Sequence, residues 1–211
     1  MKPFVVAIDG PAASGKGTIA RNLARHFDWP YLDTGLVYRA VAKNLVKKQL
    51  DQNPRNAVRE AKDLSIEDLQ QEGLRAPEIS QIASVVASIP EVRETLIEFQ
   101  RNFARKGEGA ILDGRDIGTV ICPDADIKFF VTASQEVRAN RRYQELMGQG
   151  EKITYQDVFD TLVERDLRDS TRKNAPLVQS GEAILIDTSD LNVKQSTELV
   201  IAKVELGIRD T

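Results

Sequence analysis

The chain of 211 residues has one cysteine and one histidine, and aromatic residues make up only 6% of it. A single cysteine, Cys122, excludes both a disulfide framework within the chain and a zinc site built from several cysteines. The one histidine, His26, stands in "ARHFDWPY" near the expected end of a helix. We therefore expect His26 to serve the helix terminus and not catalysis.

An excess of positive charge is also missing, because 29 Lys and Arg stand against 32 Asp and Glu. Proteins that bind nucleic acid have a basic surface, so we expect no nucleic-acid partner. No apolar run approaches the roughly 20 residues that span a bilayer. The apolar run in "MKPFVVAIDG" is also too short for a signal-peptide core. We expect a cytoplasmic, soluble protein with no membrane partner, and a monomer, because no extended apolar interface is evident.

Short apolar runs alternate with patterns of helical period along the chain. We predict strands at residues 4–8, 110–112, 127–131 and 183–186, and helices at residues 17–27, 35–49, 91–106 and 154–173. Small helices are expected within the polar residues 51–77. This alternation is typical of a parallel α/β sheet with right-handed crossovers, and we expect a single domain over residues 1–211.

A glycine-rich loop follows the first predicted strand and precedes the first predicted helix. It comprises Gly10, Pro11, Ala12, Ala13, Ser14, Gly15, Lys16, Gly17 and Thr18. Backbone amides of such a P-loop cradle phosphate oxygens, and its lysine reaches the β- and γ-phosphates of a nucleotide. Gly17 stands where the general motif has Ser or Thr, so the hydroxyl on the Mg²⁺ side would be that of Thr18. The alternative is a glycine-rich turn without a ligand.

A nucleotide switch and a phosphotransferase both use such a loop. A guanine-reading Asn-Lys-x-Asp segment is missing from the sequence, which argues against a GTPase switch. A phosphotransferase needs a second anion site with several cations. Two strand ends supply candidates, with Thr34 and Arg39 in "LDTGLVYR" and Arg115 and Asp116 in "ILDGRDIGT". Solvated charged turns are the alternative for both.

Two helices carry further candidate cations. "RANRR" holds Arg138, Arg141 and Arg142, although Arg141 could simply pair with Glu145 one turn later. In the helix at 154–173, Arg165, Asp169 and Arg172 continue the line of the apolar residues Val158 and Leu162, so they face inward. Inward charges need a partner, which a phosphate with a sugar would supply; salt bridges at the helix end are the alternative.

These motifs together resemble the bacterial cytidylate kinase family. The resemblance rests on "IDGPAASGKGT", "LDTGLVYR", "IASVVASIPEVR", "LDGRDIGT", "RANRR" and "ERDLRDSTRKNAPL", in this order, and runs from about residue 4 to the C-terminus. It implies a P-loop kinase with a monophosphate-binding insertion at about 34–106 and a lid at about 134–172. Such an enzyme transfers the γ-phosphoryl of ATP to CMP or dCMP with Mg²⁺.

The resemblance also implies a role for each matched residue. Gly10–Thr18 would bind the ATP phosphates, and Arg138, Arg141 and Arg142 would lie in the lid that folds over them. Arg39, Arg115 and Arg172 would surround the acceptor phosphate, with Lys16, Arg115 and Arg172 acting in catalysis. Ser84, Arg93 and Asp116 would read the cytosine edge, Thr34 would lie in the same pocket, and Arg165 and Asp169 would hold the ribose.

One segment departs from the family. Its members often carry a small antiparallel sheet in the insertion, whereas residues 51–77 have a helical pattern here. The other classes that we weighed are a uridylate, adenylate or shikimate kinase, which "GRDIGT" disfavours, and a nucleotide-binding regulatory module without transfer activity.

Overall fold

The computed structural model describes residues 2–209 and divides the chain into two compact units. Unit 1 combines the segment up to Tyr31 with the segment from Ala104 onward, and unit 2 spans Leu32–Phe103. The bounds of unit 2 lie close to those of the insertion expected at about 34–106. Unit 2 therefore interrupts the sequence of unit 1 once.

Unit 1 is built on parallel strands, as the apolar runs predicted. They are β1 (Phe4–Asp9), β3 (Gly109–Gly114), β4 (Ile127–Thr132) and β5 (Ile184–Asp187). With β2 (Tyr31–Asp33), where the chain enters unit 2, the sheet order is β2-β3-β1-β4-β5. Val6 pairs with Ile111 on one side and with Ile127 on the other. The glycine-rich loop therefore follows the central strand, at the carboxyl edge where open α/β sheets bind ligands.

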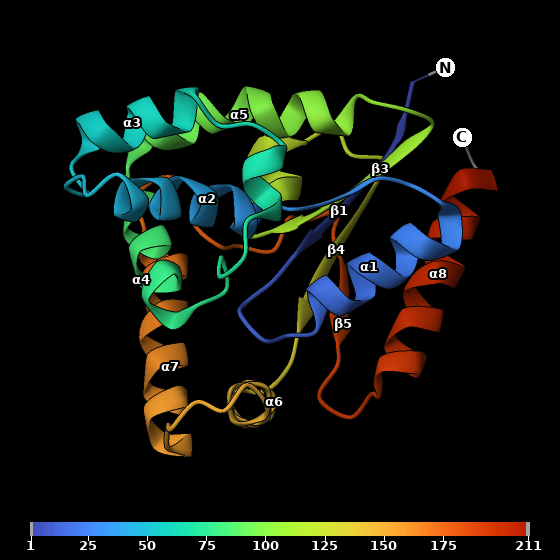
Figure 1. Cartoon of the computed structure of the whole chain (residues 1–211). Helices are drawn as coiled ribbons and strands as arrows, with labels where there is room; N and C mark the ends of the chain where they lie inside the picture. The colour runs from blue at the N-terminus through green and yellow to red at the C-terminus, as the bar shows by residue number, and fades with distance from the viewer. Residues whose placement is uncertain (1, 210–211) are drawn as a thin grey trace. The chain divides into compact units, whose positions relative to one another are not determined.

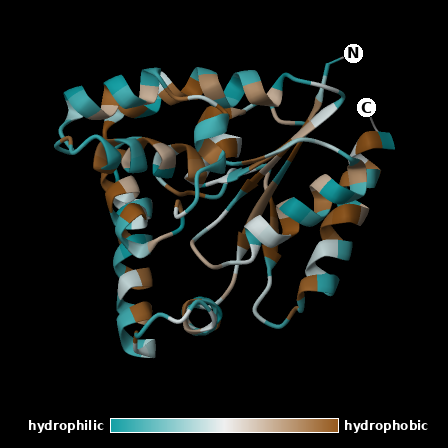
Figure 2. Cartoon of the chain, in the orientation of Figure 1, coloured by the Kyte–Doolittle hydropathy of each residue, from teal (hydrophilic) through white to brown (hydrophobic). Residues whose placement is uncertain are grey.

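Two helices of unit 1 pack together and bury the apolar core of the sheet. They are α1 (Lys16–Phe27) and α8 (Val193–Arg209), which lie side by side in Figure 1. Hydrophobic and hydrophilic residues alternate along both helices (Figure 2). The core beneath them includes Ile8, Leu23, Phe129 and Val200, each at most 1% exposed. Burial of each such side chain contributes about 1.5–3 kcal/mol to stability.

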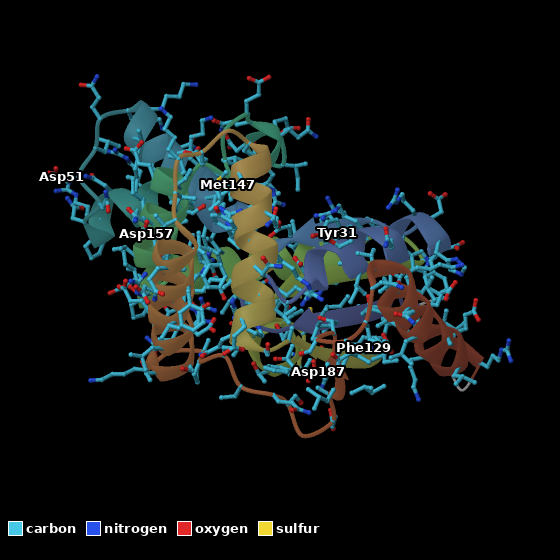
Figure 3. All side chains as sticks on the ribbon, turned by 90° about the horizontal axis from the view of Figure 1, so that it is seen from below. Tyr31, Asp51, Phe129, Met147, Asp157 and Asp187 are labelled. Carbon is cyan, nitrogen blue, oxygen red and sulfur yellow. The ribbon has the colours of Figure 1, made fainter. Side chains whose placement is uncertain are left out.

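A second pair of helices in unit 1 has a small core of its own. It consists of α6 (Gln135–Gly148), which carries Met147, and α7 (Tyr155–Thr171), which carries Asp157; both residues are labelled in Figure 3. Leu146, Val158 and Leu162 pack together there. The capping box expected at Thr154 is present, with Asp157 as its other member, and it fixes where α7 begins.

Unit 2 is helical after β2. Its elements are α2 (Thr34–Lys47), α3 (Pro54–Lys62), the short 3₁₀ helix η1 (Glu67–Gln70), α4 (Pro77–Val86) and α5 (Pro90–Ala104). The small helices predicted within 51–77 are confirmed as α3 and η1, and residues 34–103 contain no strand. Among residues 2–209, no helix has the length and apolar character needed to cross a membrane.

Candidate active site

The glycine-rich loop has a backbone that ordinary residues rarely adopt. A side chain at Gly10 would overlap the carbonyl oxygen of Val131 in β4, so only glycine fits beside that strand. Ala13 has a left-handed backbone, with a φ of 58°. The loop then leads into the N-terminus of α1 at Lys16. The turn that opens a helix, which the sequence predicted, is therefore present, and turns of this kind can present their amides to an anion.

Side chains hold the carbonyl groups of this loop. The Arg138 guanidinium donates to the carbonyl of Ala12 at 3.2 Å, and the Thr188 hydroxyl lies 2.9 Å from the carbonyl of Ser14. Lys16 Nζ lies 3.3 Å from the carbonyl oxygen of Pro11. These donors restrain the carbonyl groups of the loop, and in a loop of this kind the backbone amides are the groups that bind an anion. We call Arg138, Arg141 and Thr188 the loop brace.

The three arginines of "RANRR" have different surroundings. Arg138 is buried; besides Ala12, it donates to the carbonyl of Ala133 at 3.0 Å and pairs with Asp166 at 2.6 Å. Arg141 donates to both the hydroxyl and the carbonyl oxygen of Thr188. The pairing with Glu145 that we considered for Arg141 is made by Arg142, at 2.8 Å. Arg138 therefore contacts the loop directly and Arg141 contacts it through Thr188, while Arg142 pairs with Glu145 of its own helix.

The departure from the general motif at Gly17 has a steric cause. A Cβ at this position would lie 3.1 Å from an oxygen of Asp113, the buried acidic residue in "LDG" at the end of β3. Asp113 also accepts a hydrogen bond from the Tyr31 hydroxyl at 3.3 Å. Its carboxylate thus faces the start of α1 next to Thr18. Sequence reasoning missed Asp113, although an acidic residue at a strand end was a usable signal.

A hydroxyl and a carboxylate are oxygen ligands of the kind that Mg²⁺ prefers, so Thr18 and Asp113 fit such an ion. The described residues contain no group of three or more His, Cys, Asp or Glu side chains that could hold a metal.

The predicted residues from the turn after β3 and from α7 come together in unit 1. Arg115 Nε donates to Asp169 at 2.7 Å, and Arg165 lies 3.9 Å from the same carboxylate. Arg172 Nη2 lies 3.6 Å from Asp116, completing a group that we call the arginine–aspartate cluster: Arg115, Asp116, Arg165, Asp169 and Arg172. Asp169 is buried, which confirms that the charged line on α7 faces inward.

Electrostatics within the cluster favour the charged forms. Burial acts to raise the pKa of Asp169, but the charges of Arg115 and Arg165 outweigh it, and this pKa lies below its ordinary value. Burial also acts to lower the pKa of Arg115, and the charge of Asp169 outweighs it in turn. Three arginines against two aspartates leave the cluster with an excess positive charge. Such a cluster suits a dianionic phosphate.

The turn after β3 continues into an unusual element. Residues Ile117–Ile121 form a π-helical turn, η2, in which the Cys122 amide donates to the Ile117 carbonyl at 2.7 Å. The buried carboxylate of Asp9 accepts hydrogen bonds from the amides of Ile117 and Gly118, each at 2.8 Å. Such turns occur frequently at functional sites. The sequence indicated a glycine-flanked turn here but neither the π-helical form nor the role of Asp9.

Unit 2 carries the remaining predicted residues. Thr34 is the first residue of α2 and is buried, and Arg39 lies farther along the same helix. Ser84 is on α4, which packs against α2. Arg93 on α5 is buried; its guanidinium stands 5.6 Å from the ring centre of Tyr38 and donates to the carbonyl of Ala87. Arg93 is therefore held rigidly by a cation–π contact and a hydrogen bond.

The chain is similar to known proteins over nearly its whole length. The family model for cytidylate kinase matches residues 6–206. Cytidylate kinase of Methylocella silvestris is 52% identical over 203 residues, covering 96% of this chain and 94% of that protein. Cytidylate kinase of Xanthobacter autotrophicus is 51% identical, covering 96% of this chain and 97% of that protein.

A solved structure supports the fold. The crystal structure of an uncharacterized protein from Eubacterium ventriosum matches with a TM-score of 0.58, at 16% identity, over 96% of this chain and 98% of that one. At that identity the match shows the α/β fold alone. The family model and the two sequence relatives span nearly the whole chain, and the chain belongs to the cytidylate kinase family.

Proposed function

We propose that this enzyme transfers the γ-phosphoryl group of ATP to the phosphate of CMP or dCMP, which yields ADP with CDP or dCDP. The observation that carries the proposal is the arginine–aspartate cluster in the same unit as a phosphate-binding loop. The loop suits the donor's phosphates, and the cluster suits an acceptor that is itself anionic. Membership of the cytidylate kinase family supports cytosine as the acceptor's base.

The proposed reaction needs no general base. A non-bridging oxygen of the acceptor phosphate is already anionic and attacks the γ-phosphorus in line. The bond from that phosphorus to the β–γ bridging oxygen breaks, and ADP leaves with the electron pair. Lys16, Arg115 and Arg172 stabilise the charge spread over the transferred group. This agrees with a chain whose one histidine, His26, lies in the last turn of α1 beside Glu205.

Roles for the other residues follow from the family. The amides of Gly10–Thr18 bind the donor phosphates, which Arg141 and Arg142 approach from the lid, and the contacts of Arg138 favour support of the loop. The acceptor phosphate meets Arg39, Arg115 and Arg172, and its ribose meets Arg165 and Asp169. The cytosine edge meets Asp116, Ser84 and Arg93, near Thr34. Thr18 and Asp113 would hold Mg²⁺, which neutralises phosphate charge when bound.

Base recognition can be tested separately from phosphate binding. The Asp116 carboxylate accepts hydrogen bonds from an amino group, which cytosine has and uracil lacks. We predict that Asp116→Ala reduces the preference for CMP over UMP by about tenfold or more, the worth of one charge-assisted hydrogen bond. Steady-state kcat/KM for both acceptors measures this. An unchanged preference would remove Asp116 from base recognition.

Two other functions can be separated by one set of reactions. ADP release from Mg·ATP should be rapid with CMP and dCMP and slow with UMP, AMP, GMP and shikimate. Activity with a different acceptor alone would keep the phosphate loop and discard the cytosine assignment. Slow hydrolysis at the same rate with every acceptor would instead indicate a regulatory module. The cytoplasmic location and the monomeric state stay predictions.

A further inference from the structure

Asp9 is a buried carboxylate that the proposed reaction leaves without a role. Asp9 is the last residue of β1, directly before Gly10 of the phosphate loop, and it is only 5% exposed. Its two oxygens accept one hydrogen bond each, Oδ1 from the Ile117 amide and Oδ2 from the Gly118 amide, both at 2.8 Å. Bonds of this length to a charged acceptor are the strong kind.

The two amides belong to the start of η2. Amides at the start of a helical turn have no partner within the turn, so an outside acceptor must satisfy them. Asp116, the residue immediately before Ile117, carries the carboxylate proposed to read the base, and Arg115 comes before it. Two bonds to consecutive amides fix both the position and the direction of the backbone at this point. The positions that the side chains of Arg115 and Asp116 can reach are thereby restricted.

Burial of a carboxylate lowers the free energy of unfolding. If the side chain at this position served only to pack the core, an apolar side chain would stabilise the fold more. Burial of Asp9 has this free-energy cost, and both of its described hydrogen bonds are to the turn at residues 115–118, which we call the recognition turn. It also stands next to the loop proposed to hold the donor phosphates. One side chain therefore connects the end of the central strand with the turn that carries two proposed acceptor residues.

We propose that Asp9 is a positioning residue that sets Asp116 and Arg115 for the acceptor nucleotide by holding the amides of Ile117 and Gly118. The proposal rests on the proposed function, because it assigns Asp9 to the acceptor side of that reaction. Its contribution is to base selection and acceptor affinity, while the donor phosphates remain bound by the loop's own amides.

Asp9→Asn tests this proposal, because asparagine keeps the shape but offers one acceptor oxygen and turns an amino group toward the second amide. We expect the KM for CMP to rise by about tenfold and the preference for CMP over UMP to fall, with the KM for ATP within about twofold. A purely structural role would not separate the two substrates. Equal rises for ATP and CMP, or an unchanged KM for CMP, would overturn the proposal.

The chain offers a matched control at the other end of the same strand. Asp126 accepts a hydrogen bond from the Val5 amide at 2.7 Å, so Asp126→Asn removes a carboxylate from a backbone amide of β1 away from the recognition turn. Both KM values should stay within about twofold of the wild type. If Asp126→Asn raised the KM for CMP as much as Asp9→Asn, the effect would not be specific to Asp9 and the proposal would fail.

Amide hydrogen exchange in the wild type tests the same hydrogen bonds without any substitution, and so does not depend on whether Asp9→Asn folds. The Ile117 and Gly118 amides should exchange far more slowly than in an unstructured peptide, and saturating CMP should slow them further. Exchange at the unstructured rate, or no response to CMP in an enzyme that phosphorylates it, would overturn the role of Asp9. An enzyme with protected amides and no activity toward CMP would instead contradict the proposed function.

Discussion

At the scale of single residues, the charged groups proposed for the acceptor already have partners. Arg115 donates to Asp169 at 2.7 Å, and Arg172 stands 3.6 Å from Asp116. These pairs stabilise several buried charges. An acceptor phosphate would compete with the aspartates for the guanidinium groups, while its base and sugar would compete for the carboxylates. Under the proposed function, a ligand that carries an anion, a sugar and a hydrogen-bonding base would replace these pairs.

Lys16 is predicted to act in the reaction and not in the fold. Its ammonium lies 3.3 Å from a loop carbonyl oxygen, and Lys16 is half-buried and lies outside the apolar core, so we expect the fold to survive its loss. We predict that Lys16→Ala lowers kcat by roughly 10²-fold or more, because it removes a cation from the transferred group. Circular dichroism and thermal unfolding should match the wild type. Turnover close to normal would remove this lysine from the mechanism.

We expect the free energy of unfolding to depend on pH through the titration of Asp9. Burial raises its pKa from 3.8 to about 6, with the backbone bonds and Arg115 acting in the opposite direction and Asp116 in the same one. Lys128 of β4 also comes close to Gly118, beside Asp9. The folded chain therefore binds this proton more tightly than the unfolded chain. The stabilisation from this group is present below pH 4 and is lost as the pH rises through 6.

The size of that loss is about 3 kcal/mol in the free energy of unfolding. We predict that the stability of the wild type relative to Asp9→Asn falls by an amount of this order between pH 4 and pH 7. Urea unfolding of both proteins at several pH values measures the difference. A difference that stays constant across this range would contradict the titration of Asp9.

At the scale of elements, the loop brace supports the glycine-rich loop through hydrogen bonds to its carbonyl groups. The buried Thr188 follows β5, whose last residue, Asp187, is labelled in Figure 3, and its hydroxyl lies 2.9 Å from both the Ser14 carbonyl and an Arg141 nitrogen. A carbonyl group that accepts such a hydrogen bond keeps the neighbouring backbone amides in place. The loop therefore depends on residues about 120 to 170 positions later in the chain.

Thr188→Val removes this hydroxyl while keeping the shape of the side chain. We predict that the KM for ATP rises by about fivefold to tenfold and that the KM for CMP changes by less than about twofold. Thr197→Val is the matched control, since Thr197 is also buried and accepts a hydrogen bond from Asn22 between α1 and α8. Equal effects of the two substitutions on the KM for ATP would contradict the role of Thr188.

Elements defined by local patterns were predictable from sequence. The apolar run at 4–8 became β1, and the helix expected at 154–173 became α7 with its capping box at Thr154. The π-helical turn η2 was not predictable, because its first amides depend on Asp9, which lies 108 positions earlier. For the same reason sequence reasoning found the arginines, which stand in motifs, and missed Asp113 and Thr188.

At the scale of the whole molecule, the proposed acceptor residues are divided between the two units. Thr34, Arg39, Ser84 and Arg93 belong to unit 2, and the arginine–aspartate cluster belongs to unit 1. The resemblance to the family implied an insertion at about 34–106 within a single domain, and this stays a prediction. Spacing and composition without the family indicated only an anion pocket lined by arginine.

In the proposed reaction, a phosphoryl group moves from ATP to CMP. The most direct measurement incubates the enzyme with CMP and with ATP labelled at its γ-phosphoryl group, and then separates the nucleotides. We predict that the label appears in CDP at the rate of ADP formation, and that omission of CMP leaves ATP almost intact. Label released as free phosphate, at a rate that CMP does not change, would contradict the account.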